Sequence, residues 1–272
     1  MIKSIIVPLD GSELAESALK PGIALAVRTG AELVLVTTRW ADTSGDTPRD
    51  YLDARIAFLD HPARPLFVSD REPKDAIVLA ASEPGTVVCM ATHGRGVLRA
   101  AVLGSVAEAV VRESRAPVVL VGPRCAPEWD LGDSPVVLAG LDGSKPSLAA
   151  AHAAGDLAAA IAGRVRAIEV LRPSDVITVG EFPDADVDLL EEVVGQLTAR
   201  GVPAEYEVLD GFDPANTLVQ DADSRHAAFL ALATHGRTGL GRVALGSVAA
   251  KAVRHARCPV LVVGPAFSAE LL

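Results

Sequence analysis

The strongest constraint on the fold of this chain is an internal repeat. Residues 87–123 match residues 229–265 at an offset of 142, and 19 of these 37 positions are identical. A second match pairs VPLDGS, ending at Ser12, with AGLDGS, ending at Ser144, at an offset of 132. A length of 272 residues also suits two domains better than one. We expect domains at residues 1–123 and 135–272, with the Pro-, Gly- and charge-rich segment 124–134 as the linker.

Each copy alternates short apolar runs with helix-like stretches, such as 145–162 and 184–200. The runs are apolar throughout, which is typical of parallel strands covered on both faces. The sequence therefore predicts an α/β fold of two tandem doubly wound domains, each a five-stranded parallel sheet with helices on both faces. The expected strands are residues 4–9, 32–38, 64–69, 86–92 and 117–121, then 135–141, 164–171, 204–208, 227–234 and 259–263.

Two segments fit this pattern less well. Pro21 and Gly22 fall inside the first expected helix, so we expect a kink or a delayed start there. Residues 39–61 are weakly patterned, and a long loop with one helix is expected.

Composition excludes several classes of function. The formal charge of −10 and the absence of a basic run with interleaved aromatics argue against nucleic acid as a partner. The N-terminus reaches Asp10 too soon for a signal peptide, and no apolar run is long enough to span a bilayer. We expect a cytoplasmic protein without membrane contact, in which Cys89, Cys125 and Cys258 are buried or incidental thiols.

Gly-Ser pairs stand at the start of the last helix of each copy, at Gly104-Ser105 and Gly246-Ser247. The unpaired N–H groups of a helix start can bind a phosphate, and glycine lets the backbone approach it closely. Alternatively, each serine is only an N-cap, and Ser105 with Glu108 would form a capping box. Ala250 replaces Glu108 in the second copy. Repetition of the whole block favours the phosphate interpretation.

The motif ATHGR precedes each Gly-Ser pair and supplies Gly94 and Arg95, or Gly236 and Arg237, as further phosphate donors. An ordinary turn with a surface arginine is the alternative. His93 and His235 are interpreted as hydrogen-bonded turn residues rather than bases. Asp10 and Asp142 end the first strand of each copy, where they could bind a ribose or a phosphate-bound cation, or simply stabilise the turn. No catalytic signature is present, so no catalytic residue is assigned.

These motifs resemble the ATP-binding universal stress proteins in their tandem form. That family's signature, G-x2-G-x9-G-[ST], matches both copies from Ala91 to Ser105 and from Ala233 to Ser247, except that its first glycine is alanine in each. If this position needs positive φ, alanine weakens binding; if it needs only a small side chain, alanine suffices. We favour the second interpretation.

The resemblance implies that ATP binds in both copies, with Mg²⁺ as a further candidate whose ligands are unknown. It places adenine against the first and second strands and the phosphates against the two glycine motifs. The implied residues are Pro8, Leu9, Asp10, Val36, Ala91, Thr92, His93, Gly94, Arg95, Gly104, Ser105, Val106 and Ala107, and then Gly140, Leu141, Asp142, Val170, Ala233, Thr234, His235, Gly236, Arg237, Gly246, Ser247, Val248 and Ala249.

It also implies a stress-response regulator with slow or no ATP hydrolysis, which forms a homodimer through its last strands and binds an unidentified protein partner. An adenylyl-transferring or ATP-hydrolysing enzyme, and an interaction module without nucleotide, are the alternatives. Because Ala250 removes a carboxylate beside the second site, tighter ATP binding is expected there.

Overall fold

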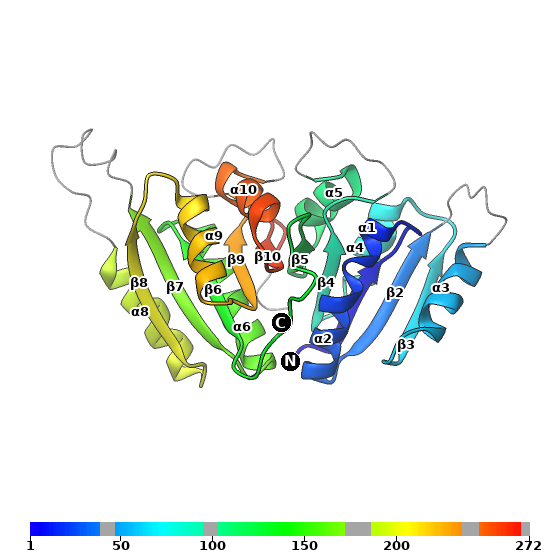
Figure 1. Ribbon diagram of the computed structural model, residues 1–272, viewed down its shortest axis with the longest axis horizontal. Coiled ribbons are helices and arrows are strands. Elements are labelled where there is room, and N and C mark those ends of the chain that lie inside the picture. The colour runs from blue at the N-terminus through cyan, green and yellow to red at the C-terminus, as the bar shows by residue number, and fades with distance from the viewer. Residues whose placement is uncertain (39–46, 95–102, 172–185, 236–244, 268–272) are drawn as a thin grey trace. The chain divides into compact units, whose positions relative to one another are not determined.

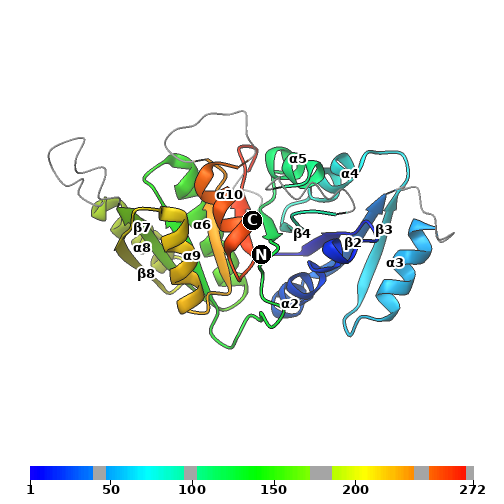
Figure 2. The same cartoon turned by 45° about the horizontal axis from the view of Figure 1, so that its top comes forward.

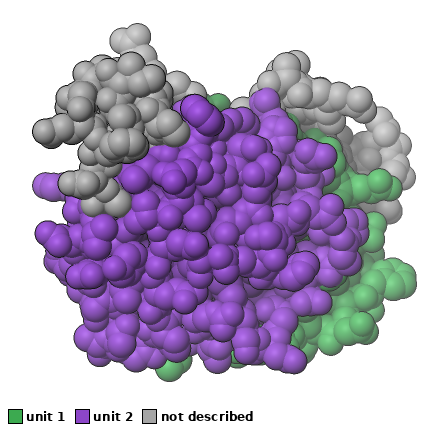
Figure 3. Space-filling model, turned by 60° about the vertical axis from the view of Figure 1, so that its left-hand side comes forward, with its two compact units in different colours: residues 1–121, 266–272 green, residues 122–265 purple. Residues whose placement is uncertain are grey.

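The computed structural model describes residues 1–38, 47–94, 103–171, 186–235 and 245–267. The chain divides into two compact units (Figure 3). The first comprises Met1–Val121 with Ala266–Leu272, and the second comprises Gly122–Pro265. Both units have the predicted doubly wound α/β fold.

The first unit is built on a parallel sheet with the strand order β3-β2-β1-β4-β5 (Figure 1). Helices α2 and α3 cover one face and α4 and α5 the other (Figure 2). The strands are β1 (Ser4–Pro8), β2 (Glu32–Thr38), β3 (Ala63–Val68), β4 (Thr86–Ala91) and β5 (Val118–Val121). The helices are α1 (Glu13–Glu16), α2 (Leu19–Thr29), α3 (Pro48–Ala57), α4 (Pro73–Ala80) and α5 (Ser105–Glu113).

The second unit repeats this arrangement with the parallel strand order β8-β7-β6-β9-β10. Contacts group α6 with α8 and α9 with α10. The strands are β6 (Val136–Leu141), β7 (Arg164–Leu171), β8 (Ala204–Asp210), β9 (Phe229–Ala233) and β10 (Val260–Val263). The helices are α6 (Lys145–Ala160), α8 (Val187–Ala199), α9 (Pro214–Ser224) and α10 (Ser247–His255).

Burial explains why the apolar runs form strands. Every residue of β4 and β6 is buried, as expected for central strands with helices on both faces. The thiols of Cys89 and Cys258 are buried as well. None of the described helices combines the length and the apolar character that a bilayer crossing needs.

The first helix of each unit differs because of Pro21. Helix α1 ends at Glu16, and α2 begins only at Leu19, so that Pro21 falls in the first turn, where its missing N–H leaves no helix bond unmade. The predicted delayed start is confirmed. In the second unit, α6 runs unbroken over 16 residues because no proline interrupts it after its first turn. Helix α3 is the one helix expected within residues 39–61, of which 39–46 lie outside the described residues.

The segment 124–134, expected as the linker, packs within the second unit. The Ala126 N–H donates to Arg257 O at 2.8 Å. The Trp129 indole is 8% exposed, donates from Nε1 to Ala228 O at 2.9 Å and meets the Phe229 ring edge-on at 5.6 Å. This tryptophan therefore covers the start of β9.

Replacing Trp129 with alanine should destabilise the second unit by about 3–5 kcal/mol, since it removes a buried aromatic side chain and leaves a cavity. Amide hydrogen exchange of peptides spanning β9 measures this loss directly. The matched control is Arg124→Ala, at an exposed position in the same segment. This change should alter the free energy of amide exchange in β9 by less than about 0.5 kcal/mol. Equal protection of β9 in both variants would show that the segment contributes nothing to the fold.

Candidate functional site

The two halves of the glycine signature meet where the strand order of the first unit reverses. Strands β2 and β4 lie on opposite sides of β1, so their carboxyl ends diverge at the place where doubly wound sheets bind ligands. The Gly104 N–H donates to Thr92 O at 2.8 Å, which closes the connection between β4 and α5. Two residues twelve positions apart in the chain therefore lie side by side at this edge.

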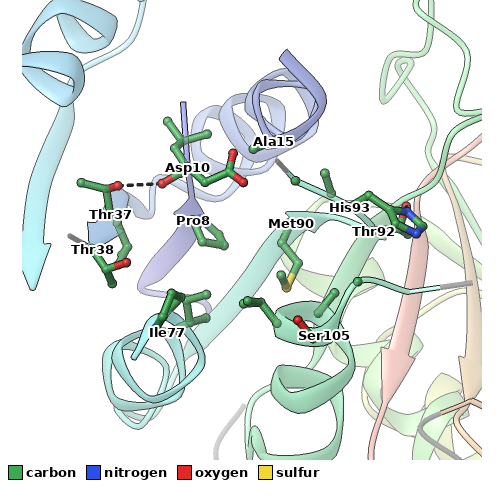
Figure 4. Close-up of a pocket in the computed structure, with 18 residues that line it drawn as sticks. Pro8, Asp10, Ala15, Thr37, Thr38, Ile77, Met90, Thr92, His93 and Ser105 are labelled. Atoms are coloured by element: carbon green, nitrogen blue, oxygen red, sulfur yellow. Dashed lines mark hydrogen bonds between the residues drawn. The ribbon is translucent and has the colours of Figure 1, made fainter. Parts of the chain in front are cut away.

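A cavity of about 230 Å³ opens there (Figure 4). Figure 4 shows Thr37 and Thr38 on one side of it and Ser105 on the other, with Pro8, Met90 and Ile77 between them. The structure brings together every site residue predicted for the first unit except Arg95, which lies outside the described residues. The lining residues are Pro8, Leu9, Asp10, Ala15, Val36, Thr37, Thr38, Pro73, Ile77, Met90, Ala91, Thr92, His93, Gly94, Gly104, Ser105, Val106 and Ala107.

Six of these were missed by sequence reasoning: Ala15, Thr37, Thr38, Pro73, Ile77 and Met90. Pro73 and Ile77 belong to α4, whose start follows β3 at the same edge of the sheet. The start of α4 was the available signal, because in a parallel sheet every helix that follows a strand begins at the carboxyl edge. Met90 directly precedes the signature alanine but carries no motif of its own.

Asp10 and Gly94 occupy one crowded point of the site. Asp10 Oδ1 accepts hydrogen bonds from the Ser12 N–H at 3.0 Å and the Ser12 hydroxyl at 2.6 Å, and Ser12 in turn caps α1. A Cβ atom at Gly94 would lie 2.0 Å from Asp10 Oδ2. The glycine is therefore required by the carboxylate, and the turn-stabilising role of Asp10 is present whatever it binds.

The start of α5 corrects the expected capping box. The N-cap is Gly104 rather than Ser105, which is already the first residue of the helix, and Glu108 is consequently one position too far for the box. No side chain caps this helix, nor does one cap α10, whose N-cap is Gly246. The backbone N–H groups of both first turns therefore have no capping side chain and face the site edge. The expectation of tighter binding in the second unit therefore rests only on the absence of the Glu108 carboxylate there, and not on a capping box.

The geometry also bears on the two alanines that replace the first glycine of the signature, and on the signature histidine. Ala91 and Ala233 end strands β4 and β9, and among described non-glycine residues positive φ occurs only at Ala162 and His226. The alanines therefore impose no left-handed strain. His93 Nδ1 lies 3.1 Å from Thr92 Oγ1, and His93 Nε2 is buried without a hydrogen-bond partner. Within the described part of the chain, the Thr92 hydroxyl is the hydrogen-bond partner of this imidazole.

Several predicted residues of the second unit make the same hydrogen bonds as their counterparts. Asp142 Oδ1 accepts from the Ser144 N–H and hydroxyl, His235 Nδ1 lies 3.1 Å from Thr234 Oγ1, and the Gly246 N–H donates to Thr234 O. Gly140 and Leu141 end β6, Ala233 ends β9, and Ser247, Val248 and Ala249 form the first turn of α10. Gly236 and Arg237 lie outside the described residues.

Strand register changes which residue of the second copy corresponds to Val36. Pro8 pairs with Val36 in the first unit, whereas its counterpart Gly140 pairs with Ile168 in the second. Ile168 is therefore the counterpart of Val36, and Val170 is the counterpart of Thr38. The repeat matches the first strands at an offset of 132, and β2 and β7 follow the same offset.

Polar and charged side chains near the first site make hydrogen bonds and ion pairs with one another. The Tyr51 hydroxyl donates to Glu16 Oε1 at 2.8 Å, and Arg55 Nε lies 2.9 Å from the same oxygen. Burial, and then the bond to Glu16, raise the pKa of Tyr51 well above its ordinary value, so the phenol stays neutral. Within the described part of the chain, no group of three or more His, Cys, Asp or Glu side chains could hold a metal ion.

Comparison with known proteins bears on the family and the fold. The model of the Universal stress protein family matches residues 1–122 and again 135–264. A universal stress protein of Methanocaldococcus jannaschii is 37% identical over 134 residues, 45% of this chain and 77% of its own length. One from Mycobacterium bovis is 35% identical over 191 residues, which cover 66% of this chain and 62% of that protein.

Among solved structures, a universal stress protein from Archaeoglobus fulgidus superposes with a TM-score of 0.66 at 18% identity, covering 96% of each chain. At that identity the likeness concerns the fold. The family model, which matches both units over nearly their whole length, establishes that this chain belongs to the universal stress protein family.

Proposed function

We propose that this chain is an ATP-binding regulatory protein in which nucleotide occupancy controls conformation or partner binding, with slow or no hydrolysis. The observation that carries the proposal is the cavity of the first unit, which joins an apolar pocket to a helix start without a capping side chain. Apolar walls with a few placed polar groups are typical of small-molecule sites.

The two ends of this cavity suit the two ends of a nucleotide. Pro8, Ile77 and Met90 supply apolar surface for a flat base, and the hydroxyls of Thr37 and Thr38 lie beside it. Thr37 Oγ1 donates to Leu9 O at 2.7 Å, which holds the end of β1 against β2. At the other end, the first turn of α5 offers backbone N–H donors and positive partial charge to phosphates.

The same geometry supports slow or no turnover. A hydrolase or adenylyl transferase needs an oriented base or nucleophile beside the phosphates, and among the described residues the hydrogen-bond partner of His93 is the Thr92 hydroxyl. ATP alone should therefore bind without rapid turnover. A role in the stress response, a homodimer through the last strands and an Mg²⁺ ion bound with the phosphates belong to the same proposal. Sedimentation velocity with and without ATP tests the assembly.

Isothermal titration calorimetry of the full chain should show ATP binding at submillimolar concentration. Gly104→Asp should weaken it at least tenfold, because an aspartate at the N-cap bonds the first-turn N–H groups and places a negative charge where the phosphates bind. The matched control is Gly195→Asp, which makes the same change on an exposed face of α8 with open space around it. No heat of binding from the unmodified chain at millimolar ATP would overturn the proposal.

Gly94→Ala should lower the stability of the first unit by about 1–2 kcal/mol and weaken ATP binding, because its methyl group displaces the Asp10 carboxylate. A double-mutant cycle with Asp10→Ala isolates this contact. In the Asp10→Ala background, Gly94→Ala should cost almost nothing, as measured by urea denaturation. A cost that stays the same in both backgrounds would mean that the two residues do not interact.

A further inference from the structure

The two units can be compared position by position around their sites. The tetrapeptide LDGS follows Pro8 in the first unit and Gly140 in the second. The tripeptide ATH follows Met90 and Leu232 in the same way. Pro73 and Pro214 are the first residues of α4 and α9, so Ile77 and Leu218 are each four residues into their helices. The counterparts of the apolar wall formed by Pro8, Ile77 and Met90 are therefore Gly140, Leu218 and Leu232.

In the second unit, the two leucines fill the space beside Gly140. A Cβ atom on Gly140 would lie 2.6 Å from Leu232 Cδ2 and 2.9 Å from Leu218 Cδ1. Both leucines are 4% exposed. In the first unit the proline side chain stands at this position, partly exposed, as a wall of the cavity. The position beside the first strand is thus occupied by the proline ring in one unit and by the two leucines in the other.

Ion pairs hold the helix that carries Leu218. Asp221 of α9 lies 3.8 Å from the buried Arg166 guanidinium of β7, which also contacts Glu205 and Glu207 of β8. At the other end of α9, the N-cap residue Asp213 pairs with Lys251 of α10. These ion pairs connect α9 to β7 and to α10, which pack beside it.

A buried carboxylate adds to the difference between the units. Glu169 is the counterpart of Thr37, is 7% exposed and accepts a hydrogen bond from the Asp186 N–H at 3.0 Å. The first unit has a short neutral hydroxyl at this point of the wall. A larger side chain at this point of the wall opposes a nucleotide sterically.

The phosphate half of the second unit, in contrast, matches the first. Its helix α10 starts after Gly246 without a capping side chain. The Gly246 N–H donates a hydrogen bond to Thr234 O, as the Gly104 N–H does to Thr92 O. Among the described residues, the difference in packing between the units lies at the wall that would hold the base.

We propose that only the first unit admits the adenine base, so that the full chain binds one ATP, and that Leu218 and Leu232 close the corresponding pocket of the second unit. The inference rests on the proposed function of the first site. It reverses the ranking expected from Ala250, because packing beside the base outweighs the loss of one carboxylate near the phosphates.

Calorimetry of the full chain with ATP gives the stoichiometry, and the matched variants Gly104→Asp and Gly246→Asp assign it. We expect one ATP per chain, at least a tenfold loss of affinity in Gly104→Asp, and affinity within twofold of the unmodified chain in Gly246→Asp. Circular dichroism checks that each variant is folded. Two ATP per chain, or equal losses in both variants, would overturn the inference while leaving the proposed function standing. No ATP binding by the unmodified chain would overturn the proposed function itself.

Photolabelling with 8-azido-ATP locates the base independently of stoichiometry, because the reactive group is on the adenine ring. Labelled peptides should come from the first unit alone. In the double variant Leu218→Ala/Leu232→Ala, which empties the pocket beside Gly140, label should also appear in α9 or β9 peptides. Label in the second unit of the unmodified chain would contradict the closure.

Discussion

The site of the first unit depends on how β1 ends. Asp10 leaves the sheet directly after Leu9, and its carboxylate binds the Ser12 N–H and hydroxyl, so that Ser12 can cap α1. Thr37 secures the same strand end from the other side through Leu9 O. The space for the Asp10 carboxylate exists only because Gly94 has no side chain. The end of the first strand and the signature loop after β4 therefore meet at one crowded point.

Glycine has opposite consequences at two points of the molecule. At Gly94 the missing side chain makes room for a polar group that shapes the site. At Gly140 it lets two leucines pack against the backbone of β6 and remove the wall that Pro8 forms in the first unit. Close packing of interiors explains both, since a protein fills any space of methyl size with its neighbours. Duplication preserved the signature, while a few apolar side chains made the units different.

Much of the fold was predictable because its signals are local and repeated. The all-apolar runs predicted strands to within a few residues, and Pro21 predicted the late start of α2. The capping box failed because the helix begins one residue earlier in register, with Gly104 as its N-cap, and helix ends depend on backbone geometry that sequence spacing leaves open. Thr37, Ile77 and Met90 escaped notice because they carry no motif and reach the site only through the order of the strands.

The sequence by itself determined that the chain contains two related α/β units, with the same glycine signature after the fourth strand of each. Identity between the copies and the apolar character of each strand were sufficient for that, because both are properties of neighbouring residues along the chain. Only the tertiary structure decided which side chains stand beside the signature. Leu218 and Leu232 lie on different elements, and their convergence on Gly140 follows from the pairing of β9 with β6 and the packing of α9 against β7 and β9.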